Sequence, residues 1–433
     1  MRIKPLLKRI LGQKIIKLYH YLQAWFWAFT YKWPAKNFFV IGVTGTKGKT
    51  TTCHLINAVL KADGKKTGLL STIGFEIAGN YKTNSLRLTT PTPRFLNKFF
   101  SDCQKAGCTH IVLEVSSHAI DQGRILGVPI KAAVFTNLSH DHLDYHKTIT
   151  LYRETKKRLW LENEIELSVI CKDDSSWPEF LRLPADRKIL YGVEDITSEE
   201  GVLAKKIQLF EQGSRFTIIC REGQVPIELK LPGKFNVSNA LAAFAVGWGL
   251  GVDFQVIKKG LESVDLVPGR MERVPLKNGL NVIIDYAHNP DSLKKVYEAI
   301  KPSVRGRLIT VLGACGNRDR SKRPIMGALA GSFADVVIVT NEDPYDEDPQ
   351  AIIDEVASGV RRGNKNKKLG ENFFKILSRK EAILKALTLA TPSDLVLITG
   401  KGAEDSMVWA DGRKTPWSDK KTVEELAEKL IKK

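Results

Sequence analysis

The sequence of 433 residues contains no internal repeat, no low-complexity tract and no C-x-x-C pair. Its six cysteines stand mostly in apolar runs such as "SVIC" and "FTIIC", which indicates buried thiols in a reducing compartment rather than a disulfide or zinc framework. Acidic residues are absent from residues 1–36. No apolar stretch there reaches, uninterrupted, the ~20 residues that a membrane-spanning helix needs.

The composition is that of a soluble globular protein, with 43% hydrophobic and 26% charged residues. The length favours two or three domains. The net charge of +18 is unevenly placed, because residues 1–36 hold eight Lys or Arg and leave 58 basic against 48 acidic residues in the remainder. A protein that binds nucleic acid is therefore the weakest hypothesis, since the remainder also lacks a recognisable reader motif.

The leader "MRIKPLLKRILGQKIIKLYHYLQAWFWAFTYKWPAK" pairs basic residues with an aromatic-rich segment at 19–33. A signal peptide is disfavoured because His20 and Gln23 interrupt the apolar stretch and no small-residue cleavage site precedes Lys32. Two interpretations stay open: a basic helix that lies in a membrane interface, or a helix that packs its aromatic face on the neighbouring domain or a partner.

From residue 37 onward, short apolar runs alternate with amphipathic helical stretches, which predicts a parallel α/β sheet covered on both faces. Strands are expected at 38–43, 66–70, 109–115, 130–136 and 167–171, with helices at 50–62, 93–106 and 150–163. An antiparallel addition at 203–231 and a small-residue helix after Gly233 follow. A second α/β series has strands at 280–285, 307–312, 335–340 and 394–399. We expect a leader at 1–36, a central domain at 37–268 and a Rossmann-like domain at 269–433, joined by a hinge at 267–274.

"GVTGTKGKTTT", at 42–52, follows the first strand and opens a helix, which predicts a phosphate-binding loop of the P-loop type. Lys49 would reach the outer phosphates and the Thr50 hydroxyl would hold a magnesium ion. The usual G-x-x-x-x-G-K-[ST] spacing is not met, because Val43 stands where its first glycine should be. A glycine-rich turn without a ligand is the alternative.

Ligands of such sheets bind beyond the carboxyl ends of the strands, and polar segments gather there. Glu114 ends one strand and would hold a magnesium ion; the alternative is a charge satisfied by a local lysine. "SHDHLDYH", at 139–146, resembles a zinc hydrolase site, but a phosphate loop in the same sheet favours magnesium.

Ten collinear motifs now carry a family resemblance. They are "GVTGTKGKTTT", "TTPTP", "EVSSHAIDQGR", "VFTNLSHDHLDYH", "YRETK", "LPGKFNVSNALAA", "PGRME", "DYAHNPDS", "GNRDRSKRP" and "ITGKGAEDS". Together they resemble the Mur ligases of bacterial cell-wall synthesis, most of all the MurE type, and the loop spacing is the one this family uses. The resemblance implies an ATP- and Mg²⁺-dependent amide ligase that adds a diamino acid to UDP-N-acetylmuramoyl-L-alanyl-D-glutamate through an acyl phosphate.

The resemblance also implies roles for individual residues. Catalysis and two magnesium sites would involve Lys49, Thr50, Glu114, His142 and Lys156, the last carbamylated; without the resemblance, Lys156 could equally be a surface lysine. ATP would contact Gly45, Thr46, Lys47, Gly48, Lys49, Thr50, Thr51, Asn236, Asn239, Arg270, Asp285, His288 and Asn289. The muramoyl and diphosphate part would contact Thr89, Thr90, Ser116, Gln122 and Arg124, and the amino acid would contact Arg318, Glu342, Asp343, Gly400 and Glu404. A hinge near Arg270 would close the second domain over ATP.

Two features depart from the family pattern. Only 36 residues precede the core, where MurE-type enzymes normally carry a domain that binds the uridine diphosphate; the substrate's nucleotide end is then held differently or presented at a membrane. Glu342, Asp343, Pro344 and Tyr345 stand where diaminopimelate-specific enzymes have D-N-P-R, whose arginine binds the distal carboxylate. The added acids at 342, 343, 346, 347 and 348 favour a cationic side chain, so lysine or ornithine stands beside diaminopimelate.

Two alternatives remain from other functions. One is a related ligase of the folylpolyglutamate or cyanophycin type, which "EVSSHAIDQGR" matches less well. The other is a nucleotide-driven switch or motor, which would not need an amino-acid pocket. The expected partners are UDP-muramoyl dipeptide and a free diamino acid, with no nucleic acid. We expect a cytoplasmic monomer, with peripheral contact to a membrane or partner protein through residues 1–34.

Overall fold

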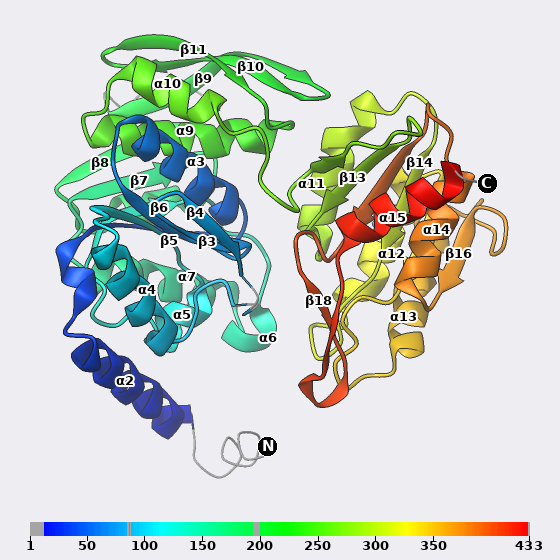
Figure 1. The fold of residues 1–433 in the computed structure, drawn as a ribbon, viewed down its shortest axis with the longest axis horizontal. Helices are drawn as coiled ribbons and strands as arrows, with labels where there is room; N and C mark the ends of the chain where they lie inside the picture. The colour runs from blue at the N-terminus through cyan, green and yellow to red at the C-terminus, as the bar shows by residue number, and fades with distance from the viewer. Residues whose placement is uncertain (1–12, 85, 87, 194–199, 432–433) are drawn as a thin grey trace. The chain divides into compact units, whose positions relative to one another are not determined.

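The computed structural model describes residues 13–84, 86, 88–193 and 200–431. The chain forms two compact units. The first is made of residues up to Gln208 together with Ser214–Lys230 and Lys234–Asp265, and the second of Leu209–Gly213, Leu231–Gly233 and Leu266–Lys433. The two units are blue to green and yellow-green to red in Figure 1.

The first unit alternates strands and helices along the chain. In order, its elements are α2 (Gln13–Thr30), η1 (Pro34–Asn37), β1 (Phe39–Thr44), α3 (Lys49–Ala62), β2 (Thr67–Leu70), β3 (Gly74–Ile77), β4 (Asn80–Thr83), α4 (Pro93–Lys105), β5 (His110–Glu114), α5 (Ser117–Asp121), β6 (Ile130–Phe135), α6 (Leu143–His146), α7 (Ile149–Leu161), β7 (Leu167–Cys171), α8 (Trp177–Leu181), β8 (Arg187–Gly192), β9 (Gly201–Phe210), β10 (Gly213–Cys220), β11 (Gly223–Leu229), α9 (Lys234–Gly249) and α10 (Phe254–Glu262).

These strands form one sheet in the order β11-β10-β9-β8-β7-β6-β1-β5-β2-β3-β4. In this spatial order, the neighbouring strands from β9 through β8, β7, β6, β1 and β5 to β2 pair in parallel. Strand β10 pairs antiparallel with β11, and β3 pairs antiparallel with β2 and β4. Strand β1 lies between β5 and β6, so the carboxyl ends of these three strands meet at one edge. Each is almost wholly buried, as expected for apolar strands covered by helices on both faces.

Helix α9 is buried on nearly all its faces, because its small and apolar side chains let it pack against α3, β7 and β8 at once. A separate cluster under the other sheet face includes Phe100, Leu113, Phe135 and Trp160. The sheet that carries the phosphate loop is therefore held rigidly from both sides.

The second unit is a smaller α/β layer. Its elements are β12 (Glu272–Val274), β13 (Asn281–Asp285), α11 (Pro290–Ile300), η2 (Lys301–Ser303), β14 (Leu308–Leu312), α12 (Lys322–Phe333), β15 (Val336–Thr340), α13 (Pro349–Gly363), β16 (Phe373–Ile376), α14 (Arg379–Leu389), β17 (Leu395–Thr399), β18 (Ser406–Val408), η3 (Ala410–Gly412), β19 (Lys414–Pro416) and α15 (Asp419–Ile431). Its six-stranded sheet has the order β12-β13-β17-β14-β15-β16, parallel except for β12.

The predicted α/β fold with two parallel sheets is confirmed, and every predicted strand and helix of the two cores is present within one or two residues of its expected ends. The aromatic part of the leader is helical in α2, whereas residues 1–12 lie outside the described residues. The strands β3, β4, β12, β16, β18 and β19, each three or four residues long, were not predicted, and neither was the six-residue strand β8. The domain boundary at 268/269 stays a prediction.

Candidate active site

The loop between β1 and α3 has the backbone geometry of an anion site. Gly48 precedes α3 with a φ of 81°, and no side chain caps the helix. The first amides of α3 lie at its N-terminus, where the helix backbone is suited to bind an anion. The Lys49 Nζ donates to the carbonyl oxygens of Gly45 (3.0 Å) and Thr46 (2.9 Å), which places an ammonium over the same loop. A polyphosphate fits this cradle.

The loop is packed too closely for larger residues. A Cβ on Gly48 would lie 2.4 Å from the Asn239 Oδ1, and one on Gly45 would lie 1.9 Å from the Thr136 Oγ1. Asn239 also accepts from the Thr52 hydroxyl (3.3 Å) and donates to Asn236 (3.0 Å). The predicted ATP contacts at 236 and 239 are thus buried on α9 directly beside the loop.

Glu114 ends β5 beside the phosphate loop and is 1% exposed. Its carboxylate accepts from the Thr50 hydroxyl (3.0 Å) and from the Thr72 amide (2.7 Å) and hydroxyl (2.9 Å). The alternative of a local lysine as its partner is therefore wrong. A buried carboxylate held by neutral donors, next to the Thr50 hydroxyl, is an oxygen-rich position that suits magnesium.

Lys156 lies inside the protein at 1% exposure, and the surface-lysine alternative is wrong. Its Nζ donates to the Gly45 carbonyl (2.8 Å) and lies 4.4 Å from the centre of the Tyr152 ring. Burial lowers the pKa of Lys156 well below its ordinary value, and the nearby cation Lys49 lowers it further. The helix α7 thus brings to the phosphate loop an amine whose uncharged form is favoured by burial.

His142 stands at the start of α6 with a φ of 55°. The residue keeps exposed surface, but its ring is crowded by the rings of His118 (5.0 Å between centroids) and Tyr152 (6.3 Å). Loss of hydration lowers its pKa to about 3, against the opposing charge of Asp141. The imidazole is then neutral at pH 7 and can act as a metal ligand.

His146, in the same segment, has hydrogen-bond partners of its own. His146 is buried, with Nε2 at 2.9 Å from the Ser117 Oγ and Nδ1 at 3.5 Å from the Thr155 Oγ1. Within the described residues, no three His, Cys, Asp or Glu side chains converge on one metal position. The segment "SHDHLDYH" therefore lacks the compact donor set of a zinc hydrolase there.

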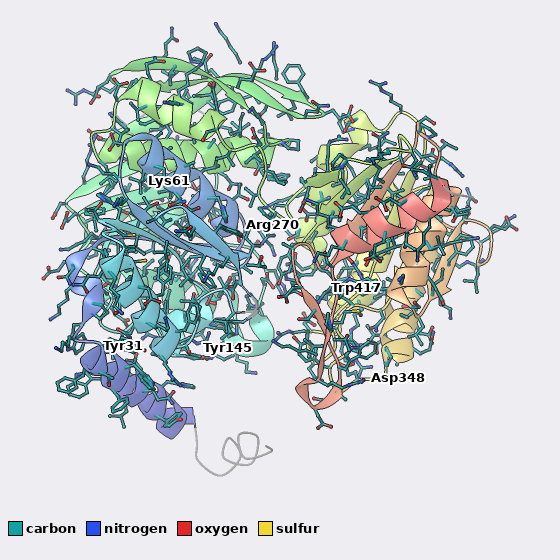
Figure 2. All side chains as sticks on the ribbon, in the orientation of Figure 1. Tyr31, Lys61, Tyr145, Arg270, Asp348 and Trp417 are labelled. Carbon is teal, nitrogen blue, oxygen red and sulfur yellow. The ribbon has the colours of Figure 1, made fainter. Side chains whose placement is uncertain are left out.

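The residues predicted to grip the muramoyl and diphosphate part form one network in the first unit. The Arg124 guanidinium donates to the Thr90 carbonyl (2.8 Å) and to the Gln122 Oε1 (2.6 Å). The Thr90 hydroxyl donates to the Glu114 carbonyl (2.9 Å) and accepts from the Ser116 amide (3.0 Å). Thr89 accepts from Thr72, the same residue that binds Glu114. Gln122 in turn donates to the hydroxyl of Tyr145, which is labelled in Figure 2.

The remaining predicted ATP contacts lie in the second unit. The Arg270 guanidinium lies 4.7 Å from the centre of the Tyr286 ring. Asp285 is buried and accepts from the amides of Met271 (2.8 Å) and Ala287 (2.7 Å), while burial raises its pKa. Asn289 caps α11 and His288 accepts a bond from Lys322 through its carbonyl. These residues gather at the carboxyl end of β13.

The predicted amino-acid contacts at the ends of β15 and β17 divide into two kinds. Asp343 is neutralised, since its two oxygens each lie 2.9 Å from the Lys401 Nζ. Lys401 also donates to Glu404 (2.5 Å), which accepts from the Tyr286 hydroxyl (3.2 Å). Asp343 and Glu404 thus share one internal cation, which offsets one of their two negative charges.

Glu342 differs from Asp343 and Glu404, because one of its carboxylate oxygens has no hydrogen-bond partner. It is 2% exposed, its Oε1 lies 3.0 Å from the Cys315 thiol, and its Oε2 has no hydrogen-bond partner. Burial raises its pKa. Gly400 has a φ of 106°, and a Cβ there would lie 2.2 Å from that free oxygen, so only glycine leaves the carboxylate its space. The Arg318 guanidinium lies 5.8 Å from the centre of the Tyr345 ring.

Three contributors were not predicted. Thr72 follows β2, and the rule that ligands gather beyond strand ends could have found it. Tyr152 and Lys401 lie inside the quoted motifs "YRETK" and "ITGKGAEDS", but only the fold shows that each contacts a predicted site residue.

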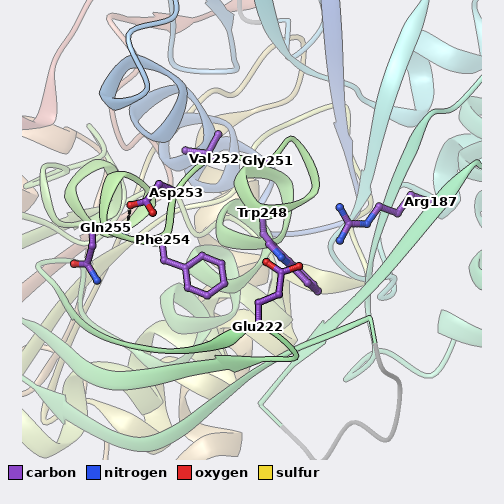
Figure 3. A pocket seen from close by; sticks show the side chains of 8 residues that line it. All are labelled: Arg187, Glu222, Trp248, Gly251, Val252, Asp253, Phe254 and Gln255. Atoms are coloured by element: carbon purple, nitrogen blue, oxygen red, sulfur yellow. Dashed lines mark hydrogen bonds between the residues drawn. The ribbon is translucent and has the colours of Figure 1, made fainter.

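A surface pocket of the first unit lies apart from these groups. It is lined by residues that include Arg187, Glu222, Trp248 and Phe254 (Figure 3), and none of the predicted site residues is among them. It therefore has no part in the site described above.

The chain is similar to known proteins over most of its length. Residues 43–247 match the Mur ligase middle domain, and residues 269–402 match the Mur ligase, glutamate ligase domain. A UDP-N-acetylmuramoyl-L-alanyl-D-glutamate--2,6-diaminopimelate ligase of Bacillus cereus is 39% identical over 381 residues, which span 86% of this chain and 75% of that protein. A UDP-N-acetylmuramyl-tripeptide synthetase of Roseiflexus is 37% identical and spans 90% and 78%.

Solved structures agree with these relatives. The structure of a UDP-N-acetylmuramoyl-L-alanyl-D-glutamate--2,6-diaminopimelate ligase has a TM-score of 0.63 and 31% identity, covering 91% of this chain and 79% of that one. Folylpolyglutamate synthase of Mycobacterium tuberculosis, complexed with ADP, reaches a TM-score of 0.72 at 20% identity, covering 88% and 91%. The second likeness shows the fold alone.

Proposed function

Because the chain belongs to the Mur ligase family, and within it to the ATP-dependent ligases of the MurE type, we propose that it adds a diamino acid to the D-glutamyl carboxylate of UDP-N-acetylmuramoyl-L-alanyl-D-glutamate. One observation carries this proposal. The phosphate loop, the Thr50–Glu114 pair and the buried Lys156 lie together at one sheet edge. That edge also carries the Arg124 network, so phosphate and substrate groups belong to one site.

The reaction proceeds in two balanced steps. An oxygen of the substrate carboxylate bonds to the γ-phosphorus of ATP while the bond to the ADP oxygen breaks. The amine of the incoming amino acid then bonds to the acyl carbon, inorganic phosphate leaves, and the amine loses a proton. The amides of α3 and the Lys49 ammonium hold the phosphates and stabilise the charge that moves between them. Arg124 and Thr90 position the carboxylate substrate.

Mur ligases use Mg²⁺, which supplies further neutralisation of the phosphate charge. Of two magnesium ions, Thr50 and Glu114 would hold the first and His142 the second, with Lys156 as a further metal ligand. The donor set fits, since a hydroxyl, a carboxylate with neutral partners and a neutral imidazole lie around the loop. As a free cation, Lys156 would repel the metal.

Carbamylation resolves that conflict. The uncharged amine of Lys156 adds to CO₂ and loses a proton, which turns a would-be cation into a carboxylate. The buried Nζ, with Lys47 and Lys49 among the charges that act on it, favours this conversion, because the carbamate would pair with cations that disfavour an ammonium. We therefore assign Lys156 as a carbamylated metal ligand.

The amino acid added is proposed to be a diamino acid whose ammonium binds Glu342. Of the acids expected to favour a cationic side chain, Asp343 is neutralised by Lys401 and Glu347 by a two-bond contact with Arg323. The free oxygen of the buried Glu342 supports the cationic preference more directly than the number of acids does. With Tyr345 in place of arginine, lysine or ornithine is favoured over diaminopimelate.

The test is incubation with ATP, Mg²⁺, UDP-muramoyl dipeptide and each candidate amino acid, with the product identified by mass. A tripeptide product with at least one diamino acid is expected. Strict dependence on diaminopimelate would overturn the preference for a cationic side chain while leaving the ligase intact. Product only with a folate or another carboxylate acceptor would overturn the substrate assignment itself.

The location follows from the substrates. We propose that the protein is cytoplasmic, because ATP and the uridine-linked precursor are both charged nucleotides, and that it is a monomer. No helix in the described part of the chain has the length and apolar character needed to cross a membrane. We also propose that residues 1–34 bring the protein into peripheral contact with the inner face of the membrane.

A further inference from the structure

One face of α2 is fixed to the rest of the first unit. Ala24 and Ala28 are each 1% exposed, and α2 packs against α4. The hydroxyl of Tyr21 accepts from the Arg158 guanidinium (2.8 Å), and the Arg94 guanidinium lies 5.0 Å from the centre of the Trp27 ring. The helix is therefore held in one orientation by contacts of its inner side.

The opposite face of α2 is apolar and exposed. Tyr19, Leu22, Trp25, Phe26 and Phe29 are each 54–62% exposed. Their spacing places all five on one side of the helix, and the rings of Trp25 and Phe29 stack with centroids 5.6 Å apart. We name these five residues the outer face of α2; the side chains of this helix, with Tyr31 at its end, are drawn in Figure 2.

An isolated exposed leucine is ordinary, but five large apolar side chains on one helical side form a contact surface. In the described part of the chain, no element covers more than about half of any of these side chains.

The charge of the segment that carries this surface indicates what covers it. Residues 1–36 contain eight Lys or Arg and no Asp or Glu. Lys32 and Lys36, just after the helix, are both exposed. A partner must therefore offer negative charge beside an apolar layer. An anionic phospholipid surface offers both, and Trp, Tyr and Phe are the side chains that concentrate at its interface.

We infer that the outer face of α2 docks on an anionic phospholipid bilayer, with its aromatic rings among the lipid head groups and the basic residues paired with lipid phosphates. This inference deepens the peripheral contact proposed above and does not depend on the ligase reaction. The inner-face contacts favour binding, since the helix is already formed and oriented before it reaches the membrane.

Flotation of the full-length protein with vesicles tests it. One vesicle preparation holds equal phosphatidylglycerol and phosphatidylcholine, and the other only phosphatidylcholine. We expect the protein to float with the anionic vesicles, to bind the neutral ones at least about tenfold less, and to dissociate in about 1 M salt, where charges more than about 3 Å apart are screened.

The decisive variant is Trp25→Ser with Phe29→Ser, and the matched control is Leu369→Ser with Leu377→Ser, two exposed leucines of the second unit. The first pair is expected to lower vesicle binding at least about tenfold and the control to leave it unchanged. Lys32→Gln with Lys36→Gln gives a second variant that leaves the apolar face intact, and it is expected to weaken binding to anionic vesicles only.

Ligase turnover is measured on every variant in the same samples. Retained turnover with lost flotation in the Trp25→Ser, Phe29→Ser variant supports the inference. Normal flotation of a wild type that shows no turnover would contradict the proposed function and leave the inference intact. Equal flotation of the wild type, the Trp25→Ser, Phe29→Ser variant and the Lys32→Gln, Lys36→Gln variant would overturn the inference. So would light scattering that shows a wild-type dimer, a monomeric Trp25→Ser, Phe29→Ser variant and no vesicle binding, because a second copy would then occupy the face.

Discussion

At the scale of the residue, we expect Lys156 to lower the stability of the fold while serving the ligase reaction. Burial lowers its pKa in the folded state below the ordinary ~10.4, so between the two values the unfolded chain binds more protons than the native site. Stability therefore rises with pH across that window, and at pH 7 the buried amine destabilises the fold. Its hydrogen-bond acceptor, the Gly45 carbonyl, also accepts from Lys49.

We expect Lys156→Met to raise the melting temperature at pH 7 by roughly 2–4 °C in buffer depleted of CO₂, with the gain shrinking as the pH approaches 10. The same variant should lose ligase turnover at least ~100-fold. Calorimetry and a phosphate-release assay measure the two effects. In the wild type, readdition of bicarbonate should restore turnover lost on CO₂ depletion; retained turnover in Lys156→Met would remove the carbamate from the mechanism.

Gly48 offers a second test at this scale, because its positive φ and the contact with Asn239 act together. We expect Gly48→Ala to raise the KM for ATP about tenfold or more, as the new methyl group would displace Asn239 and strain the loop. Gly64→Ala is the matched control, with a φ of 74° and nothing within 4 Å of the added methyl. An equal change in KM for both variants would mean that backbone strain alone, and not the Asn239 contact, matters.

At the scale of the element, the sequence predicted the central strands because they are short runs of mostly apolar residues, as expected of buried parallel strands. The strands β18 and β19 were not predicted, because three residues are too few to show an alternation of apolar and polar side chains. Site residues at strand ends were predictable, because ligands of parallel sheets bind beyond the carboxyl ends of the strands. The burial of Lys156 was not, because its acceptor, Gly45, is 111 residues away in the chain.

The number of acids in this segment could not show which of them is available to a ligand, for a related reason. The acids at 343 and 347 suggested a cationic ligand, but each is paired with an internal cation that it shares with another acid, and these partners stand far off in the sequence. Only the fold separates Glu342, with its free oxygen, from acids that hold loops in place. The sequence thus showed that this segment is acidic, but not which carboxylate is available to a ligand.

Asp394 links the starts of β14 and β17 and supplies a prediction about these elements. It accepts from the Arg307 amide (2.6 Å) and guanidinium (2.8 Å) and from the Thr391 amide (2.9 Å). Burial alone would raise its pKa, but these hydrogen bonds outweigh burial and hold the pKa below its ordinary value. Its contribution to stability is therefore present above the unfolded pKa of ~3.9 and is lost as the pH falls through the folded pKa.

We expect Asp394→Asn to lower the free energy of unfolding by about 1 kcal/mol at pH 7, a modest figure because the Arg307 side chain is half exposed. Urea unfolding from pH 7 down to pH 3 measures it. The difference from the wild type should hold near pH 7 and shrink below pH ~4. A difference that stays constant over this range would indicate lost hydrogen bonds without any charge contribution.

At the scale of the whole molecule, each unit has a core of its own. The cluster under the second sheet runs from Val274 to Leu426 and draws on no residue of the first unit. Its length is that of an independent domain. The predicted domain 269–433 omits Leu209–Gly213 and Leu231–Gly233, which belong to the second unit by their contacts. The omission removes the Arg273–Glu211 ion pair, a partly exposed contact worth ~1 kcal/mol or less.

We therefore expect the fragment 269–433 to fold alone and to unfold cooperatively in urea, followed by the fluorescence of its only tryptophans, Trp409 and Trp417. Both are set by tertiary contacts, since their ring nitrogens donate to Thr415 and Asp419. Addition of the 209–233 segment in a longer fragment should raise stability only slightly. Non-cooperative unfolding of 269–433, with cooperativity restored in the longer fragment, would place the functional boundary before residue 209 and make the β9–β11 segment part of the second domain.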